Sequence, residues 1–344
     1  MMAGMPRMTP ANAMDDDELA LLCATSTLGR TPLELEEPLG PVTWHELART
    51  LDRHGRSPGW LFETSALGLR AIGVATATAN LVMRRMTRRD RVIEDREKLR
   101  AHGYWMATEI DPAYPSRLMR LGERRPTVVY GVGEQALLEA PSVAVVGSRD
   151  VDPAGAAFAE RAGRRTAEAG SVLVSGGARG TDVMAMGAAG EAGGRVVGVL
   201  SADLPRWAGE ATNAAAIAEG QLTLLTIAHP EVPFSNAIAL ARNKVIYALG
   251  DVSLVVACDS LKGGTRHGAM EAIKHGWGPV LVRAGVDAPP GNALLINDGA
   301  YAIGDEDLDS VMSLQRRIDD AANAWAERHE SGPDDTVQPR LIDD

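Results

Sequence analysis

Residues 142–182 read SVAVVGSRDVDPAGAAFAERAGRRTAEAGSVLVSGGARGTD, and this stretch decides the fold. Two short β-branched runs, VAVV and VLV, enclose a helix-length segment, and a loop containing Gly follows each run. Strands that are apolar throughout are typical of a parallel sheet covered on both faces, with helices as the crossovers. The stretch therefore predicts a strand–helix–strand unit of an α/β protein.

The same alternation continues toward the C-terminus. Further β-branched runs stand at 195–200, 222–227, 253–259 and 279–283, and helix-length segments stand at 182–193, 236–250 and 268–276. We expect an α/β fold with a doubly wound, mostly parallel sheet over residues 105–305. Ligands of such sheets bind beyond the carboxyl ends of the strands, so the loops after each run are the candidate site.

The flanking residues predict a small helical domain and two acidic ends. We expect residues 1–14 to be disordered, residues 15–104 to form a helical N-terminal domain, and residues 306–344 to form an acidic helix with a disordered tail. Between Arg84 and Arg100, eight basic and four acidic residues favour a solvated helix with i,i+4 ion pairs. A phosphate-binding face is the alternative interpretation of this segment.

The net charge of −11 comes from the two ends of the chain. Residues 1–20 hold four acids against one Arg, residues 301–344 hold twelve acids against four Arg, and residues 21–300 balance at 30 and 30. A neutral domain can still present a basic groove, because affinity for nucleic acid depends on local neutralisation of phosphates. The acidic ends therefore neither support nor exclude a nucleic-acid ligand.

Composition excludes several classes of protein. The sequence has no apolar run of 18 residues, and its N-terminus lacks the basic-then-apolar layout of a secretory signal. Its two cysteines, Cys23 and Cys258, are far apart, which suits a reducing cytosol and excludes a Cys-rich zinc site. We expect a cytoplasmic protein with no membrane partner and no metal site.

Two loops after predicted strands combine Gly with Arg, and together they contribute seven candidate phosphate-binding residues. Gly lets the backbone approach a ligand, free N–H groups at a following helix N-terminus favour an anion, and Arg adds bidentate donors. Neither loop has a dinucleotide or Walker A fingerprint, and Gly-rich turns are common in such sheets. The candidates are Gly147, Ser148, Arg149, Gly176, Gly177, Arg179 and Gly180.

Two further segments complete the candidate site. Arg242, Asn243 and Lys244 interrupt an otherwise apolar helix, and a helix start near Arg242 would place all three at the ligand edge of the sheet. An exposed stripe on the helix is the alternative, although consecutive residues point about 100° apart. The second segment follows the run VVAC and suits a phosphate-facing turn; it comprises Lys262, Gly263, Gly264 and Thr265.

Catalytic residues are not evident. His229, His267 and His275 lack Cys or acidic partners at metal-ligand spacing. Asp182 and Asp259 follow strands, where an acid can act in catalysis but more often caps a helix. We find no nucleophile with its base, so we expect a binding protein without a cofactor.

Five motifs in a fixed order, the first made of two segments, carry a family resemblance over residues 105–303. DPAYPSRL and PTVVYGVG begin at Asp111 and Pro126, VAVVGSR follows, SGGARGTD comes next, and ARNKVIYAL and GNALLINDGA complete the series. Together they resemble the DNA-processing protein A (DprA/Smf) family. The resemblance implies a Rossmann-like core whose basic pocket holds single-stranded DNA, which the recombinase RecA then receives.

Carried over to this sequence, the resemblance places six of the candidates in that pocket: Ser148, Arg149, Arg179, Arg242, Asn243 and Lys244. The sequence also departs from the family's pattern, because Met186 stands where many members have His and only a predominantly acidic stretch of about 40 residues follows the core instead of a winged-helix domain. These departures indicate a divergent branch, in which a role in natural transformation, recombination or defence stays open.

Aromatic residues are 4% of the chain, so we expect contacts with the DNA backbone to dominate over base stacking. Trp207 is the pocket-side aromatic that we expect to stack. Because one pocket per subunit would bind weakly, we also predict a homodimer.

Two other functions use the same loops. Residues 262–271, KGGTRHGAME, are similar to the P-G-G-x-G-T-x-x-E motif of phosphoribohydrolases, with Glu271 one residue late. A sensor of a small nucleotide would need the same arginines as a DNA-binding protein. Dependence of affinity on ligand length distinguishes a sensor from a DNA-binding protein.

Overall fold

The computed structural model describes residues 14–31, 34, 36–258 and 263–330. The predicted disorder of residues 1–13 and 331–344, and the candidate Lys262, lie outside these residues. The chain divides into two compact units, one of Met1–Tyr114 with Pro126–Val129 and one of Pro115–Arg125 with Tyr130–Asp344. Each unit is described by itself.

The first unit is helical and is organised around α1 (Asp16–Thr25). Asp15 begins this helix by accepting a hydrogen bond from the Glu18 N–H at 2.8 Å. Every residue from Leu19 to Thr25 is buried, as expected of a helix that is apolar all round. The elements that accompany α1 are α2 (Pro41–Arg53), η1 (Pro58–Phe62), α3 (Ala66–Ala71), α4 (Thr76–Met86), α5 (Arg89–Ala101) and β1 (Trp105–Thr108).

The arginines of α4 and α5 act mainly as structural donors. Lys98 pairs with Glu94 at i,i+4, as the solvated-helix interpretation predicted. Arg85, however, is fully buried and donates to the backbone carbonyls of Cys23 and Ser26. Arg91 likewise donates to the carbonyl of Gly29. The two Arg85 bonds satisfy carbonyl groups at the C-terminal end of α1, which offsets the cost of burying this arginine.

The second unit contains the predicted sheet. In the described residues its strand order is β2-β6-β5-β4-β3-β7-β8-β9, and the run from β6 to β9 is parallel. β2 pairs antiparallel with β6 through Tyr130–Val132. The prediction of a Rossmann-like, mostly parallel sheet is confirmed. The strands are β2 (Val128–Val132), β3 (Ser142–Val146), β4 (Val172–Ser175), β5 (Val196–Leu200), β6 (Leu222–Thr226), β7 (Val252–Val255), β8 (Val280–Arg283) and β9 (Tyr301–Ile303).

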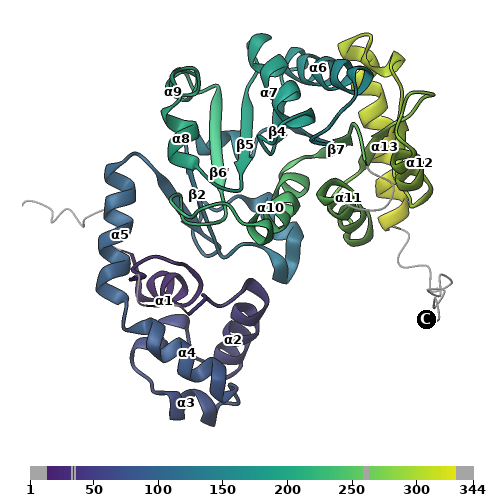
Figure 1. The fold of residues 1–344 in the computed structure, drawn as a ribbon. Helices are drawn as coiled ribbons and strands as arrows, with labels where there is room; N and C mark the ends of the chain where they lie inside the picture. Colours follow the sequence, from purple (N-terminus) through teal and green to yellow (C-terminus); the bar gives the residue numbers. More distant parts are fainter. Residues whose placement is uncertain (1–13, 32–33, 35, 259–262, 331–344) are drawn as a thin grey trace, which may run out of the picture. The chain divides into compact units, whose positions relative to one another are not determined.

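Every residue of strands β3 to β8 is buried. Burial on both sides of each strand indicates that helices cover both faces of this sheet. α6 (Pro153–Glu168) and α7 (Thr181–Glu191) pack closely on each other and on β3 and β4. Gly163 permits this approach, since a β-carbon there would overlap with the Ala185 carbonyl oxygen. α10 (Asn236–Leu249) and α11 (Gly264–His275) form a second packed pair (Figure 1).

The second unit also contains the C-terminal helix α13 (Val311–Glu330), the 3-10 helix η4 (Glu306–Leu308) and several shorter helices. α13 packs on α6, β8 and η4, with Leu314 and Ala321 buried, and Arg165 of α6 donates to the carbonyls of Leu308 and Asp309. The remaining elements are η2 (Ser116–Arg124), η3 (Gln135–Leu138), α8 (Leu204–Gly209), α9 (Ala211–Ala218) and α12 (Pro290–Asn297).

Two features are absent from the residues that the structure describes. Within the described ranges, no helix has the length and apolar character needed to cross a bilayer. The same ranges contain no group of three His, Cys, Asp or Glu side chains that could hold a metal ion.

Candidate functional site

Four loops meet at the carboxyl edge of the sheet. They follow β5, β4, β3 and β7, which are neighbours in that order. The chain passes from β3 outward to β6 and then returns to β7 on the other side of β3. Such a reversal opens a crevice between the two loop sets, and ligands of open α/β sheets bind there.

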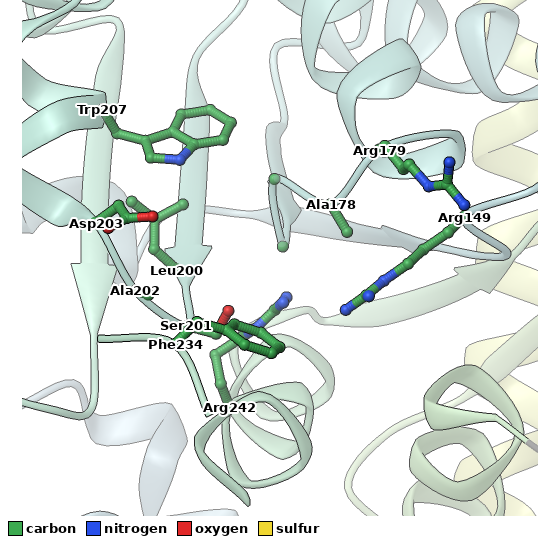
Figure 2. A pocket seen from close by; sticks show the side chains of 12 residues that line it. Arg149, Ala178, Arg179, Leu200, Ser201, Ala202, Asp203, Trp207, Phe234 and Arg242 are labelled. Atoms are coloured by element: carbon green, nitrogen blue, oxygen red, sulfur yellow. The ribbon is translucent and has the colours of Figure 1, made fainter. Parts of the chain in front are cut away.

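The first cavity at this edge has a volume of about 320 Å³. Arg149 directs its guanidinium into it, Arg242 enters from α10, and Trp207 forms the opposite wall (Figure 2). The lining residues are Arg149, Gly176, Gly177, Ala178, Arg179, Leu200, Ser201, Ala202, Asp203, Trp207, Phe234 and Arg242.

A second cavity of about 570 Å³ adjoins the first. Both are lined by Arg149, Ala178 and Arg242, and we call these two neighbouring cavities together the groove. The second cavity adds Gly147, Ser148, Asp182, Asn243, Gly263, Gly264 and Thr265, among others. The structure thus brings the predicted loops after β3, β4 and β7 to one place.

Arg242 and Asp182 form the floor of the groove. Arg242 is 4% exposed and Asp182 is 6% exposed. Among the described atoms, the Arg242 Nε has no hydrogen-bond partner. Burial lowers the pKa of Arg242, and the negative charge of Asp182 opposes that effect. Burial likewise raises the pKa of Asp182 to about 6, against the opposing effects of Arg242 and of N–H groups from Ala178 and Gly176.

Gly176 leaves room for this floor. A β-carbon at Gly176 would overlap with the Arg242 Nη1 and would lie 2.8 Å from the Asp182 Oδ2. The Ala178 N–H donates to the same Oδ2 at 3.2 Å, which holds the loop after β4 against α7. Gly177, at φ +65°, lies under the Trp207 ring, with 3.0 Å between its ideal β-carbon and Cη2. Both glycines therefore permit close approach of the groove walls.

Gly147 and Gly180 join the loops after β3 and β4. A β-carbon at Gly147 would overlap with the Thr181 hydroxyl, and one at Gly180 would lie 2.7 Å from the Ser148 carbonyl oxygen. The Thr181 N–H and hydroxyl both donate to that carbonyl, at 3.2 and 3.1 Å. The N–H of Thr181 is consequently not free for an anion, contrary to the expectation for the start of this helix.

Arg149 and Arg179 differ in their availability. Within the described part of the chain, Arg149 makes no ion pair or hydrogen bond, and it is exposed. Arg179 pairs with Asp150 at 2.7 Å, and its guanidinium turns away from the cavity centre in Figure 2. Its side chain is 72% exposed, so the pair contributes little and can be exchanged for a phosphate.

The helix predicted at 236–250 is present as α10, so the alternative start near Arg242, which would have placed all three residues at the ligand edge, is not adopted. α10 begins at Asn236, where the Ser235 hydroxyl accepts the Ile238 N–H and caps the helix. Asn243 and Lys244 point in different directions from Arg242, because consecutive helical residues lie about 100° apart around the axis. Asn243 lines the second cavity beside Gly264, whereas the Lys244 Nζ bonds to the Glu271 Oε1 at 3.0 Å. Lys244 does not line either cavity of the groove.

The N-terminus of α11 closes the side of the groove beyond β7. Gly263 precedes the helix with no side-chain cap, and Gly263, Gly264 and Thr265 line the second cavity. The Thr265 hydroxyl donates to the Gly147 carbonyl oxygen at 3.0 Å. Uncapped N–H groups at a helix N-terminus favour anions, so this end can contribute to phosphate binding.

Sequence analysis did not identify every residue in the wall of the first cavity that lies opposite Arg149. Trp207 was expected beside the pocket and does line it, but Phe234, Leu200, Ser201 and Asp203 were not singled out. Phe234 is 49% exposed, an unusual state for Phe that only the structure reveals. Asp203 adopts a left-handed conformation at φ 59°. The sequence did contain a signal for residues 200–203: they lie at the end of a predicted parallel strand, and ligand-binding loops follow such strands.

The fold and the site define a Rossmann-like α/β protein with an arginine-lined groove at the switch point of its sheet. The family model described as DNA recombination-mediator protein A matches residues 105–314. The chain belongs to that family.

Solved structures agree with this assignment. The chain is similar to DNA processing protein A (DprA) from Streptococcus pneumoniae, with 21% identity, a TM-score of 0.67, and coverage of 89% of this chain and 98% of that one. It is also similar to DNA processing protein A from Helicobacter pylori, with 25% identity, a TM-score of 0.51, and coverage of 63% and 97%. That structure is described by its single-stranded DNA binding mode. No curated protein matches the chain.

Proposed function

We propose that this protein binds single-stranded DNA in the groove and does not catalyse a reaction. The observation that carries the proposal is that Arg149 and Arg242 line both neighbouring cavities at the sheet's switch point. Family membership and the single-stranded DNA of the H. pylori relative support the choice of ligand.

The phosphate contacts follow from the side chains that face the groove. Arg149 is unengaged within the described residues, Arg179 lies at the rim, and the N-terminus of α11 adds N–H groups on the far side. Cations and N–H donors of this kind bind phosphates without reading sequence. The proposal therefore predicts binding that tolerates any sequence and weakens with salt.

Base contacts come from the other wall. Trp207 and Phe234 both line the first cavity and present aromatic surface to it (Figure 2). Bases of a single strand are unpaired and can stack on such rings, whereas bases in a duplex cannot. This wall supports a preference for single strands.

The phosphoribohydrolase alternative lacks its carboxylate. Glu271 bonds to Lys244, and its Oε2 lies 3.3 Å from the His267 Nε2. It does not line either cavity of the groove. Glu271 stands one residue later than the glutamate of the phosphoribohydrolase motif. Because one residue turns a helix by about 100°, its carboxylate is expected to point away from the groove, as it does.

The proposal includes a biological role for the bound strand. The bound strand is protected in the groove and is then passed to the recombinase RecA, in DNA uptake, recombination or defence. A homodimer would place two grooves on one strand and raise the affinity through effective concentration.

A series of ligand lengths tests the proposal. We expect the affinity for oligothymidylates to rise steadily from a mononucleotide through about 5, 20 and 50 nucleotides, because each added phosphate adds contacts and binding registers. Competition against a labelled 50-nucleotide strand, read by fluorescence anisotropy, gives the affinities. A mononucleotide that binds as tightly as the long strands would instead identify a nucleotide sensor.

A further inference from the structure

Asp182 is an acid at the floor of a groove that otherwise attracts anions. It lines the second cavity, and it is held by α7, which packs on β3, β4, β5 and α6. Its Oδ2 accepts the Ala178 N–H, and the Gly176 N–H is a second backbone donor. These two bonds fix the carboxylate and, with it, the loop after β4.

Several charged or titratable groups face this carboxylate. Arg242 and Tyr247 act on it from α10, and Arg149 acts from the loop after β3. α6 packs on α7, and its residues Ala159 and Ala162 are buried and apolar. Arg242 is therefore the main cation neighbour of Asp182, and the same guanidinium lines both cavities of the groove.

The Arg242 Nη1 and the Asp182 Oδ2 both border the space beside Gly176, although the two described side chains form no ion pair or hydrogen bond with each other. A phosphate bound at Arg242 would therefore place a second anion near Asp182. Two anions that share one buried cation repel each other, which favours the neutral form of the weaker acid. A carboxylate can become neutral by taking a proton, whereas a DNA phosphodiester stays ionised. The repulsion is relieved when a solvent proton forms an O–H bond on Asp182.

We propose that Asp182 is a proton-linked positioning residue: it holds the groove floor around Arg242 when the groove is empty and takes up a proton when a DNA phosphate binds. This inference rests on the proposed function and adds its regulation. It makes the affinity for DNA depend on pH through one buried carboxyl group.

The sign of the dependence follows from linkage. In the free protein the pKa of Asp182 is raised by burial to about 6, so the group is ionised at pH 7.5. A neighbouring phosphate raises this pKa further in the complex. Between the two values binding takes up a fraction of a proton, and affinity rises as the pH falls. For the uptake of one proton, the increase in affinity is at most about tenfold per pH unit.

The test measures binding of a labelled 20-nucleotide oligothymidylate at pH 5.5, 6.5 and 7.5 and constant ionic strength. We expect wild-type affinity to increase roughly 3- to 8-fold from pH 7.5 to 6.5. Asp182→Asn keeps the size of the side chain and an oxygen acceptor but cannot titrate, and we expect it to lose this slope. His267 and the other histidines are unchanged in the variant, so the difference in slope isolates Asp182.

Asp203→Asn is the matched control, because Asp203 is an acid of the same groove and Asn also tolerates its left-handed conformation. It should keep the wild-type slope whatever its affinity. A merely structural role for Asp182 would shift the affinity of Asp182→Asn equally at all three pH values, and that result overturns the inference.

A second measurement needs only the wild type, so it tests the inference even if Asp182→Asn does not fold. Calorimetric titration of the wild type in two buffers of different ionisation enthalpy reports proton uptake directly. Uptake near pH 6.5 is expected, and binding without uptake overturns the inference while leaving the proposed function intact. A folded wild type that binds no single strand at any pH overturns both.

Discussion

The double variant Arg149→Ala/Arg179→Ala is expected to bind a single strand about 100-fold more weakly than the wild type near 0.1 M salt. Each arginine supplies a charge-assisted contact to phosphate worth at least about 1.5 kcal/mol, and roughly 1.4 kcal/mol corresponds to a factor of ten. Both residues line the first cavity, and neither is buried in the fold. The variant should therefore fold normally.

Salt dependence gives the same experiment a second readout. Each phosphate contact contributes about 0.7 to the slope of log affinity against log salt for single strands, so the slope should fall by about 1.4. The matched control is Arg164→Ala/Arg316→Ala, which removes two exposed arginines from α6 and α13, outside the groove. Equal losses in the two double variants would show that general charge, rather than the groove, binds DNA.

Gly180→Ala is expected to lower the free energy of unfolding by about 3 kcal/mol or more, because such backbone strain and overlap are among the costliest single changes. Gly180 has φ +80° and ψ −128°, a conformation open to glycine. A β-carbon would also lie 2.5 Å from the Arg149 carbonyl oxygen, which is backbone and cannot rotate away. Urea denaturation followed by circular dichroism measures the loss.

Gly187→Ala is the control for that substitution. Gly187 lies within α7, the helix that Gly180 precedes, and an ideal β-carbon there meets nothing within 4 Å. Alanine in a helix interior is favoured over glycine by roughly 0.5–1 kcal/mol, so this variant should be as stable as the wild type or more so. A stable Gly180→Ala protein would contradict the contact between the loops after β3 and β4.

The fold was largely predictable because its signals are local. Continuous apolar runs such as VAVV and VLV became β3 and β4, and the Gly-containing loops after them became two walls of the groove. The carboxyl-edge rule for parallel sheets then brought loops together that are far apart in the sequence. This rule needs only the order of strands and helices.

Side-chain direction was less predictable because it depends on tertiary packing. Arg242, Asn243 and Lys244 are adjacent in sequence, yet one is buried at the groove floor, one lines the second cavity and one pairs with Glu271. The start of α10 set this outcome, and the cap at Ser235 was not recognised in the sequence. The relation of Asp182 to Arg242 crosses two helices, so no spacing in the sequence could reveal it.

The most direct test of DNA binding compares a labelled single strand of about 50 nucleotides with its duplex, by anisotropy, across salt concentrations from about 50 to 200 mM. We predict binding to the single strand that weakens steeply with salt and exceeds binding to the duplex at every concentration. Absence of single-strand binding by the folded wild type at the lowest salt would contradict the proposed function.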